Sequence, residues 1–69
     1  MRVMHVVRKD LRGELMRHEV CVSEQPDGDG AATIDCGKDV VRAWECAAEI
    51  RDAINKATGA SIEIQTVVR

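Results

Sequence analysis

Aromatic side chains are almost absent from this sequence, which holds one Trp, Trp44, and neither Phe nor Tyr. Modules that bind single-stranded nucleic acid usually stack bases on several aromatic side chains of a sheet or groove. This chain lacks the residues for such a platform. The volume of its hydrophobic core must therefore come mainly from Val, Ile, Leu, Met and Ala.

The sequence also lacks closely spaced cysteines. The three residues, Cys21, Cys36 and Cys46, form no C-x-x-C motif, and an odd number cannot pair completely within one chain. This usage is typical of reduced thiols in the cytoplasm rather than of a secreted disulfide framework. We therefore expect a cytoplasmic protein.

Long apolar runs and a strong net charge are missing as well. The N-terminal apolar stretch is interrupted by Arg2, His5, Arg8 and Lys9, so we expect neither a signal peptide nor a membrane span. The net charge of −2 argues against a general nucleic-acid binder, because such proteins are usually basic. A chain of 69 residues has room for a single domain, 1–69, with one core.

One segment, 39–58, has the apolar spacing of an amphipathic helix. Its apolar residues recur every three or four positions, so at about 100° per residue they fall on one face. Asp39 is suited to cap the start of this helix, and Gly59 to end it in a left-handed conformation. The apolar stripe consists of Val40, Ala43, Ala47, Ile50, Ile54 and Ala57.

Four other segments, 2–8, 14–24, 31–36 and 61–68, alternate apolar and polar residues as strands with one buried face do. Turn residues separate the first three of them. The order β-β-β-α-β predicts an α+β fold, in which one helix packs on one face of a four-stranded mixed, mainly antiparallel sheet. A right-handed crossover places the last strand parallel to the first or the third, and we favour the strand order 3-2-1-4 over 1-2-3-4.

The turn at 10–13 sets the expected register of the first hairpin. A four-residue loop pairs Val7 with Met16, His5 with His18 and Val3 with Val20. The second hairpin needs a loop with an odd number of residues, such as 25–29, to keep its apolar residues on the same face. The expected helix-side residues of the first two strands are Val3, Val7, Met16, Val20 and Val22, and Cys21 points to the face opposite Cys36.

His5, His18 and Cys36 would then lie on neighbouring strands about 5 Å apart. Imidazole and thiolate groups are zinc ligands, and Asp39 or Cys46 could complete a site. The alternative is two buried, hydrogen-bonded histidines beside a small buried cysteine. We favour this alternative, because the spacing matches no known zinc motif, and we predict neither a metal nor a cofactor.

Other catalytic and metal signatures are weak. The stretch 27–30 begins like a calcium loop, but Ala31 and Ala32 stand where that motif needs an acidic residue and a glycine. A catalytic Cys36 would need a base such as His18 in a cleft, and one helix on a small sheet offers little concavity. We therefore expect no enzyme, and we interpret 27–30 as an acidic hairpin tip.

The face of the sheet away from the helix mixes apolar and basic residues, and Met and Arg are enriched at protein interfaces. We therefore predict that this face, together with one edge of the helix, binds another protein or a second copy of this chain. An ordinary half-polar surface is the alternative, and Trp44 would then serve as the edge of a small core. The predicted contact residues are Arg2, Met4, Val6, Arg8, Arg17, Trp44 and Arg51.

The expected function is that of a small non-catalytic protein-binding module. In size and simplicity the chain resembles the accessory inhibitors encoded by phages and mobile elements, anti-CRISPR proteins among them, which implies action by occupying a partner's surface. Two alternatives stay open. One is a nucleic-acid-binding regulator that uses Arg2, Arg8, Arg12 and Arg17, and the other is a metal-binding module built on His5, His18 and Cys36.

Overall fold

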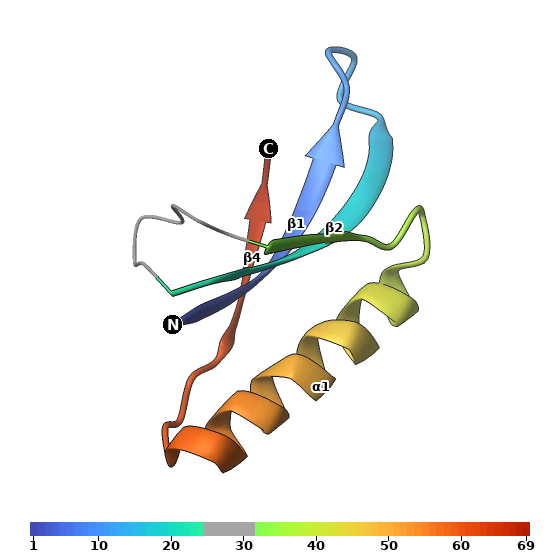
Figure 1. The fold of residues 1–69 in the computed structure, drawn as a ribbon. Helices are drawn as coiled ribbons and strands as arrows, with labels where there is room; N and C mark the ends of the chain where they lie inside the picture. Colours follow the sequence, from blue (N-terminus) through green and yellow to red (C-terminus); the bar gives the residue numbers. More distant parts are fainter. Residues whose placement is uncertain (25–31) are drawn as a thin grey trace.

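The computed structural model describes residues 1–24 and 32–69, shown in Figure 1. Its elements are β1 (Arg2–Lys9), β2 (Leu15–Ser23), β3 (Ala32–Asp35), α1 (Val40–Thr58) and β4 (Ile64–Val68). The strands form one sheet in the order β3-β2-β1-β4. The predicted turn at 25–30, with its calcium-like stretch 27–30, lies outside the described residues. The predicted pairing of even-numbered residues in the second hairpin is confirmed, because Val20 lies opposite Ile34 and Val22 opposite Ala32.

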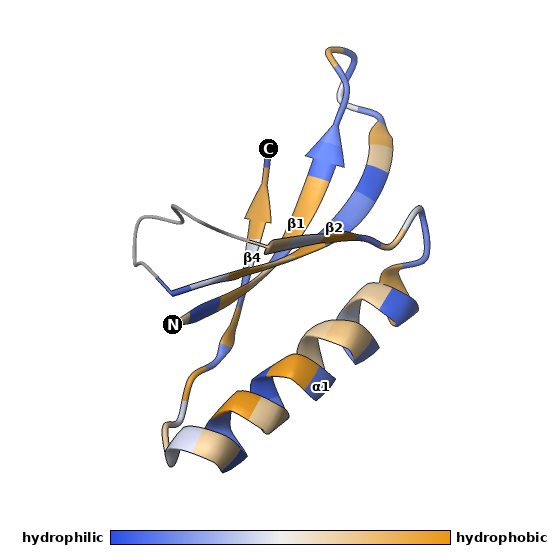
Figure 2. Ribbon diagram, viewed as in Figure 1, coloured by the Kyte–Doolittle hydropathy of each residue, from blue (hydrophilic) through white to orange (hydrophobic). Residues whose placement is uncertain are grey.

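The predicted α+β class and the predicted strand order are both confirmed. β1 pairs antiparallel with β2 and parallel with β4, and β2 pairs antiparallel with β3, so the sheet is mixed. Figure 1 shows α1 lying diagonally across one face of this sheet, and Figure 2 shows apolar and polar residues alternating around its axis. The parallel β4 follows from the crossover through α1.

The predicted register of the first hairpin is wrong by two residues, although the predicted faces are right. Val3 lies opposite Val22, His5 opposite Val20 and Val7 opposite His18. Odd-numbered residues of β1 therefore still share a face with even-numbered residues of β2, because a shift of two residues leaves each side chain on its own side.

Two local features produce this shift. The carboxylate of Asp10 accepts hydrogen bonds from the N–H groups of Arg12 and Glu14, and the N–H of Asp10 donates to the carbonyl of Glu14. The loop is therefore 11–13, one residue shorter than predicted, with Gly13 at φ 80°. Each hydrogen bond stabilises a three-residue loop that ends in a left-handed glycine.

The second feature is a bulge at Met16. The register changes between Lys9, which lies opposite Leu15, and Arg8, which lies opposite Arg17, so Met16 is the extra residue of β2. It is exposed, and its predicted place in the core opposite Val7 is wrong. The shorter loop alone would have turned every side chain of β2 to the other face of the sheet. The bulge adds one residue to β2, so the predicted faces are kept.

The core on the helix side is built from small and branched residues. Five buried residues form it, and partly buried isoleucines of α1, β4 and the segment before β4 pack against them. Ala43 and Ala47 allow α1 to approach the sheet closely, because their side chains are short. The two ends of the predicted stripe, Val40 and Ala57, are exposed. The buried members are Val3, Val20, Cys36, Ala43 and Ala47.

The predicted ends of the helix are confirmed. The carboxylate of Asp39 accepts a hydrogen bond of 3.1 Å from the N–H of Arg42, as an N-cap residue does. At the other end Gly59 has φ 72° and donates its N–H to the carbonyl of Asn55. That left-handed conformation favours glycine at this position.

The last strand begins later than predicted, at Ile64 instead of residue 61. The side chain of Asn55 accepts a hydrogen bond of 3.0 Å from the N–H of Ile62 and donates one of 3.1 Å to its carbonyl. The main chain of Ile62 is thereby bound to the end of α1 rather than to β1. Its side chain still packs against the core, as the alternation predicted.

Candidate functional site

His5 and His18 form a hydrogen-bonded pair beneath α1. The distance between Nε2 of His5 and Nδ1 of His18 is 2.7 Å, and the ring centroids lie 4.9 Å apart. Both residues are buried. The contact that the sequence predicted is therefore present, but it runs diagonally between strands, because His5 lies opposite Val20.

The surroundings of His5 disfavour the charged form of its imidazole. Burial, and second the charge of His18, lower the pKa of His5 below its ordinary value. Nδ1 of His5 is buried and has no partner within the described residues. An unpaired buried N–H costs more than an unpaired lone pair, so we place the proton of His5 on Nε2, from which it is donated to His18.

Cys36 lies beside His18 in the ladder but does not complete a metal site. Its N–H donates to the carbonyl of His18 at 2.9 Å, whereas its Sγ lies 3.8 Å from the carbonyl of Ile34. Burial, and second the neighbouring Cys46 thiol, raise the pKa of Cys36, which favours the protonated thiol over the thiolate that binds metals or attacks substrates. Across residues 1–24 and 32–69, no three His, Cys, Asp or Glu side chains gather around a point that could hold a metal ion.

Trp44 packs against His5 from the helix. Its ring centroid lies 5.2 Å from that of His5, at an interplanar angle of 55°. The residue is nevertheless 42% exposed. Trp44 thus forms the edge of the core with one side of its ring and presents the other side to solvent.

The opposite face of the sheet does not expose the apolar residues that were predicted to contact a partner. Met4 and Val6 are only 3% and 0% exposed, and they pack with Cys21 and Val67 of the neighbouring strands. Their predicted role as contact residues therefore requires correction, because a side chain that is already buried has no surface left to offer. The alternation of β1 identified their face but not how fully their neighbours cover it.

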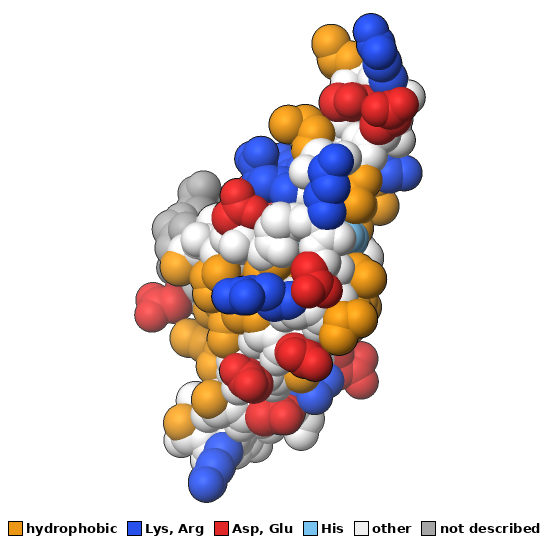
Figure 3. Space-filling view, turned by 90° about the vertical axis from the view of Figure 1, so that its right-hand side faces the viewer, with side chains coloured by type: hydrophobic (Ala, Val, Ile, Leu, Met, Phe, Trp, Pro, Cys, Tyr) orange, Lys and Arg blue, Asp and Glu red, His pale blue; other side chains and the backbone are white. Residues whose placement is uncertain are grey.

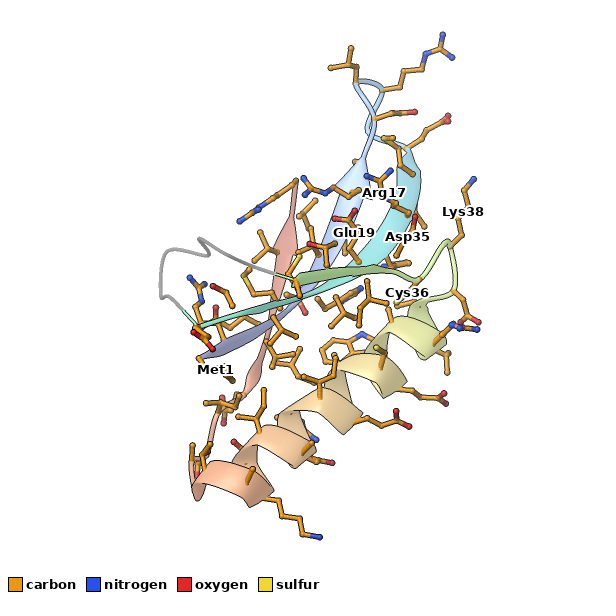
Figure 4. All side chains as sticks on the ribbon, viewed as in Figure 1. Met1, Arg17, Glu19, Asp35, Cys36 and Lys38 are labelled. Carbon is orange, nitrogen blue, oxygen red and sulfur yellow. The ribbon has the colours of Figure 1, made fainter. Side chains whose placement is uncertain are left out.

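An ion triad around the buried carboxylate of Glu19 lies beside this second cluster. Oε1 of Glu19 accepts a hydrogen bond of 2.7 Å from Nε of Arg8, and Oε2 accepts one of 2.8 Å from Nε of Arg17. The hydrogen bonds from Arg17 and Arg8 lower the pKa of Glu19. Figure 4 shows Arg17, Glu19 and Asp35 close together on neighbouring strands. This triad was not predicted, and its only signal in the sequence was a glutamate near two arginines on one face.

The predicted arginines are largely engaged within the chain. Arg8 and Arg17 bind Glu19, Arg2 donates to Oε1 of Gln65 at 2.6 Å, and Arg51 forms an ion pair with its neighbour Asp52. Arg8 and Arg17 keep about a third of their side chains exposed. An internal carboxylate thus competes with phosphate for two of the four arginines that the nucleic-acid alternative requires.

Exposed apolar residues lie instead on the first half of α1. Val41 is 61% exposed and precedes the half-exposed Trp44 by three positions, so the two share one side of the helix. We call these two residues the Trp44 flank. Figure 3 shows hydrophobic side chains at the surface beside the small area of exposed histidine.

Comparison with known proteins provides no relative: no protein-family model, curated protein or solved structure gives a significant match to this chain. Within the described ranges, no helix has both the length and the apolar character needed to cross a membrane. The function must therefore be inferred from the surfaces of the molecule.

Proposed function

We propose that this chain is a small non-catalytic protein-binding module that acts by occupying a surface of its partner. The observation that carries the proposal is the Trp44 flank. A half-exposed Trp beside a branched aliphatic residue has the composition of a binding hot spot, in which a few side chains supply most of the affinity. The partner in this proposal is a different protein.

Two further features support a binding role. The contact between Trp44 and His5 holds the ring in place, so little side-chain entropy is lost when a partner covers its exposed side. Arg51 lies seven positions further along the same side of α1, where its charge can contribute to the rim of an interface. Both residues were predicted contacts, and both remain accessible.

The chemistry of the buried groups supports a non-catalytic function. The two histidines are hydrogen-bonded to each other, and the Cys36 thiol is favoured in its protonated form. A module of this kind inhibits or assists its partner by covering a surface, as the small accessory proteins of phages and mobile elements do.

Affinity purification with matched variants tests this proposal. The tagged chain serves as bait in cells of its native host, and recovered proteins are identified by mass spectrometry. We expect Trp44→Ala and Val41→Lys to reduce recovery of the partner at least tenfold. Leu11→Ser is the control, because Leu11 is fully exposed at the tip of the first hairpin, far from the flank in sequence.

Two results would overturn the proposal. One is equal recovery of the partner by the wild type and both flank variants. The other is a dimer of this chain, found by light scattering, that the flank variants dissociate, since the flank would then bind a second copy. Far-UV circular dichroism of each variant checks that its fold is retained.

A further inference from the structure

A groove separates β3 from α1, on a different side of the helix from Trp44. Its volume is about 250 Å³. Within the described chain, α1 packs against β1, β2 and β4 but not against β3, which leaves this space open. The groove is lined by Ile34, Asp35, Cys36, Arg42, Glu45, Cys46 and Glu49.

The strand that borders the groove has a free edge. In the described part of the sheet, β3 pairs only with β2. Cys36 donates its N–H to His18, and Ile34 lies opposite Val20. Because hydrogen-bonding directions alternate along a strand, the main-chain groups of Thr33 and Asp35 point away from β2. They are available to a further strand.

The helix wall of the groove carries an excess of negative charge. Glu45 and Glu49 are exposed and lie one turn apart, whereas Arg42 is the single basic residue of the lining. Neither glutamate takes part in an ion pair within the described residues. Figure 3 shows acidic side chains gathered over α1. Such a wall favours a cationic side chain.

The floor of the groove is apolar. Ile34 is 43% exposed, and Cys46 is half-buried against the core. Asp35 also borders the groove, and its carboxylate accepts a hydrogen bond of 2.8 Å from the N–H of Gly37. The groove thus combines a free strand edge, an apolar floor and an acidic wall.

We propose that this groove binds an extended basic segment of a partner protein, which adds a strand to the edge of β3. The main chain of the segment pairs with Thr33 and Asp35, an apolar side chain packs on Ile34, and a Lys or Arg pairs with Glu45 and Glu49. β3 is four residues long, so the contact is short. Peptides bind other domains in this way when an edge strand lies beside a helix.

A synthetic octapeptide of alternating Val and Lys is the probe. It is titrated into the full, ¹⁵N-labelled chain, and amide shifts are followed by NMR while fluorescence anisotropy gives the affinity. We expect shift changes at Thr33, Asp35 and residues 42–49 of α1. A peptide of alternating Val and Glu should bind at least tenfold more weakly, because it meets the acidic wall with like charge.

Two variants test separately how the strand edge and the acidic wall contribute to peptide binding. Thr33→Pro removes an N–H that points away from β2, so the existing ladder keeps its hydrogen bonds. The double variant Glu45→Lys, Glu49→Lys reverses the charge of the wall. Each should weaken binding at least tenfold. The control is Glu14→Lys, Glu63→Lys, which makes the same change in net charge at exposed positions outside the groove and should change binding less than twofold.

Several outcomes would overturn this inference. They are no binding of the Val-Lys peptide by the wild type, equal weakening by the control variant, shift changes centred on the Trp44 flank, or a dimer of this chain that Thr33→Pro dissociates. Trp44 does not line the groove, so partner recovery that depends on Trp44 can persist while the peptide fails to bind. Dispersed amide spectra of both groove variants check that the fold is intact.

Discussion

The two faces of the sheet bury polar groups in different ways. On the helix side, the imidazoles of His5 and His18 are joined by one hydrogen bond beneath α1. On the other side, the charged Glu19 is only 5% exposed and is held between two arginines that reach solvent.

This difference follows from the cost of burial. A neutral imidazole can be buried with a single partner, whereas a carboxylate needs opposite charge at both oxygens to offset the loss of hydration. The helix thus covers the face whose buried polar groups are the two imidazoles. The face without the helix keeps its charges near water, where the arginines remain partly solvated.

The largest expected effect comes from shortening one core valine on each face. Val20→Ala and Val6→Ala should each lower the free energy of unfolding by about 2 kcal/mol, because each removes two buried methyl groups and leaves a cavity. Chemical denaturation measures both values. A loss below about 0.5 kcal/mol for Val6→Ala alone would show that only the helix side is tightly packed.

The next effect concerns the ion triad. Glu19→Gln should cost about 1 kcal/mol at neutral pH, a value limited by the solvent exposure of both arginines. The folded pKa of Glu19 is lowered from 4.5, so its contribution to stability is present above that pH and is lost as the pH falls below it. Thermal unfolding between pH 6 and pH 3 should show a smaller loss of stability in the variant. An identical pH profile would contradict a stabilising triad.

The smallest expected effect on stability concerns the histidine pair, and it occurs at a higher pH than the effect of Glu19. The folded pKa of His5 lies below 6.5, so the unfolded chain binds more protons between these two values, and stability decreases as the pH falls below 6.5. We expect the Tm of the wild type to fall between pH 7 and pH 5. His5→Gln should remove that decrease, and Glu19→Gln, the control, should retain it. A wild-type Tm that is constant over this range would refute the assignment.

The alternation of apolar and polar residues was sufficient to predict the faces of the sheet. Val3, Val20 and Cys36 lie under the helix as expected, and Cys21 lies on the other side. The register was not predictable to the residue, because it depends on the hydrogen bonds of the Asp10 carboxylate and on the bulge at Met16. Sequences with the same apolar pattern can differ in both of these local features, so the pattern alone does not determine the register.

The candidate sites were less predictable than the fold. The sequence singled out Trp44, the two histidines and the arginines, but it gave no measure of how far neighbouring strands would cover Met4 and Val6. The groove beside β3 was not predicted. It exists because α1 packs on three strands and leaves the fourth uncovered, and no residue spacing encodes that choice.

The amino-acid sequence alone determined the order of elements, the ends of α1 and the side of the sheet to which each strand residue points, because helical and strand periodicities and capping residues act over a few neighbouring positions. The tertiary structure decided which of those residues remain accessible. Exposure depends on contacts between segments far apart in the chain, such as His5 with Trp44 and Glu19 with Arg8, and these contacts exist only once the sheet and helix have packed together.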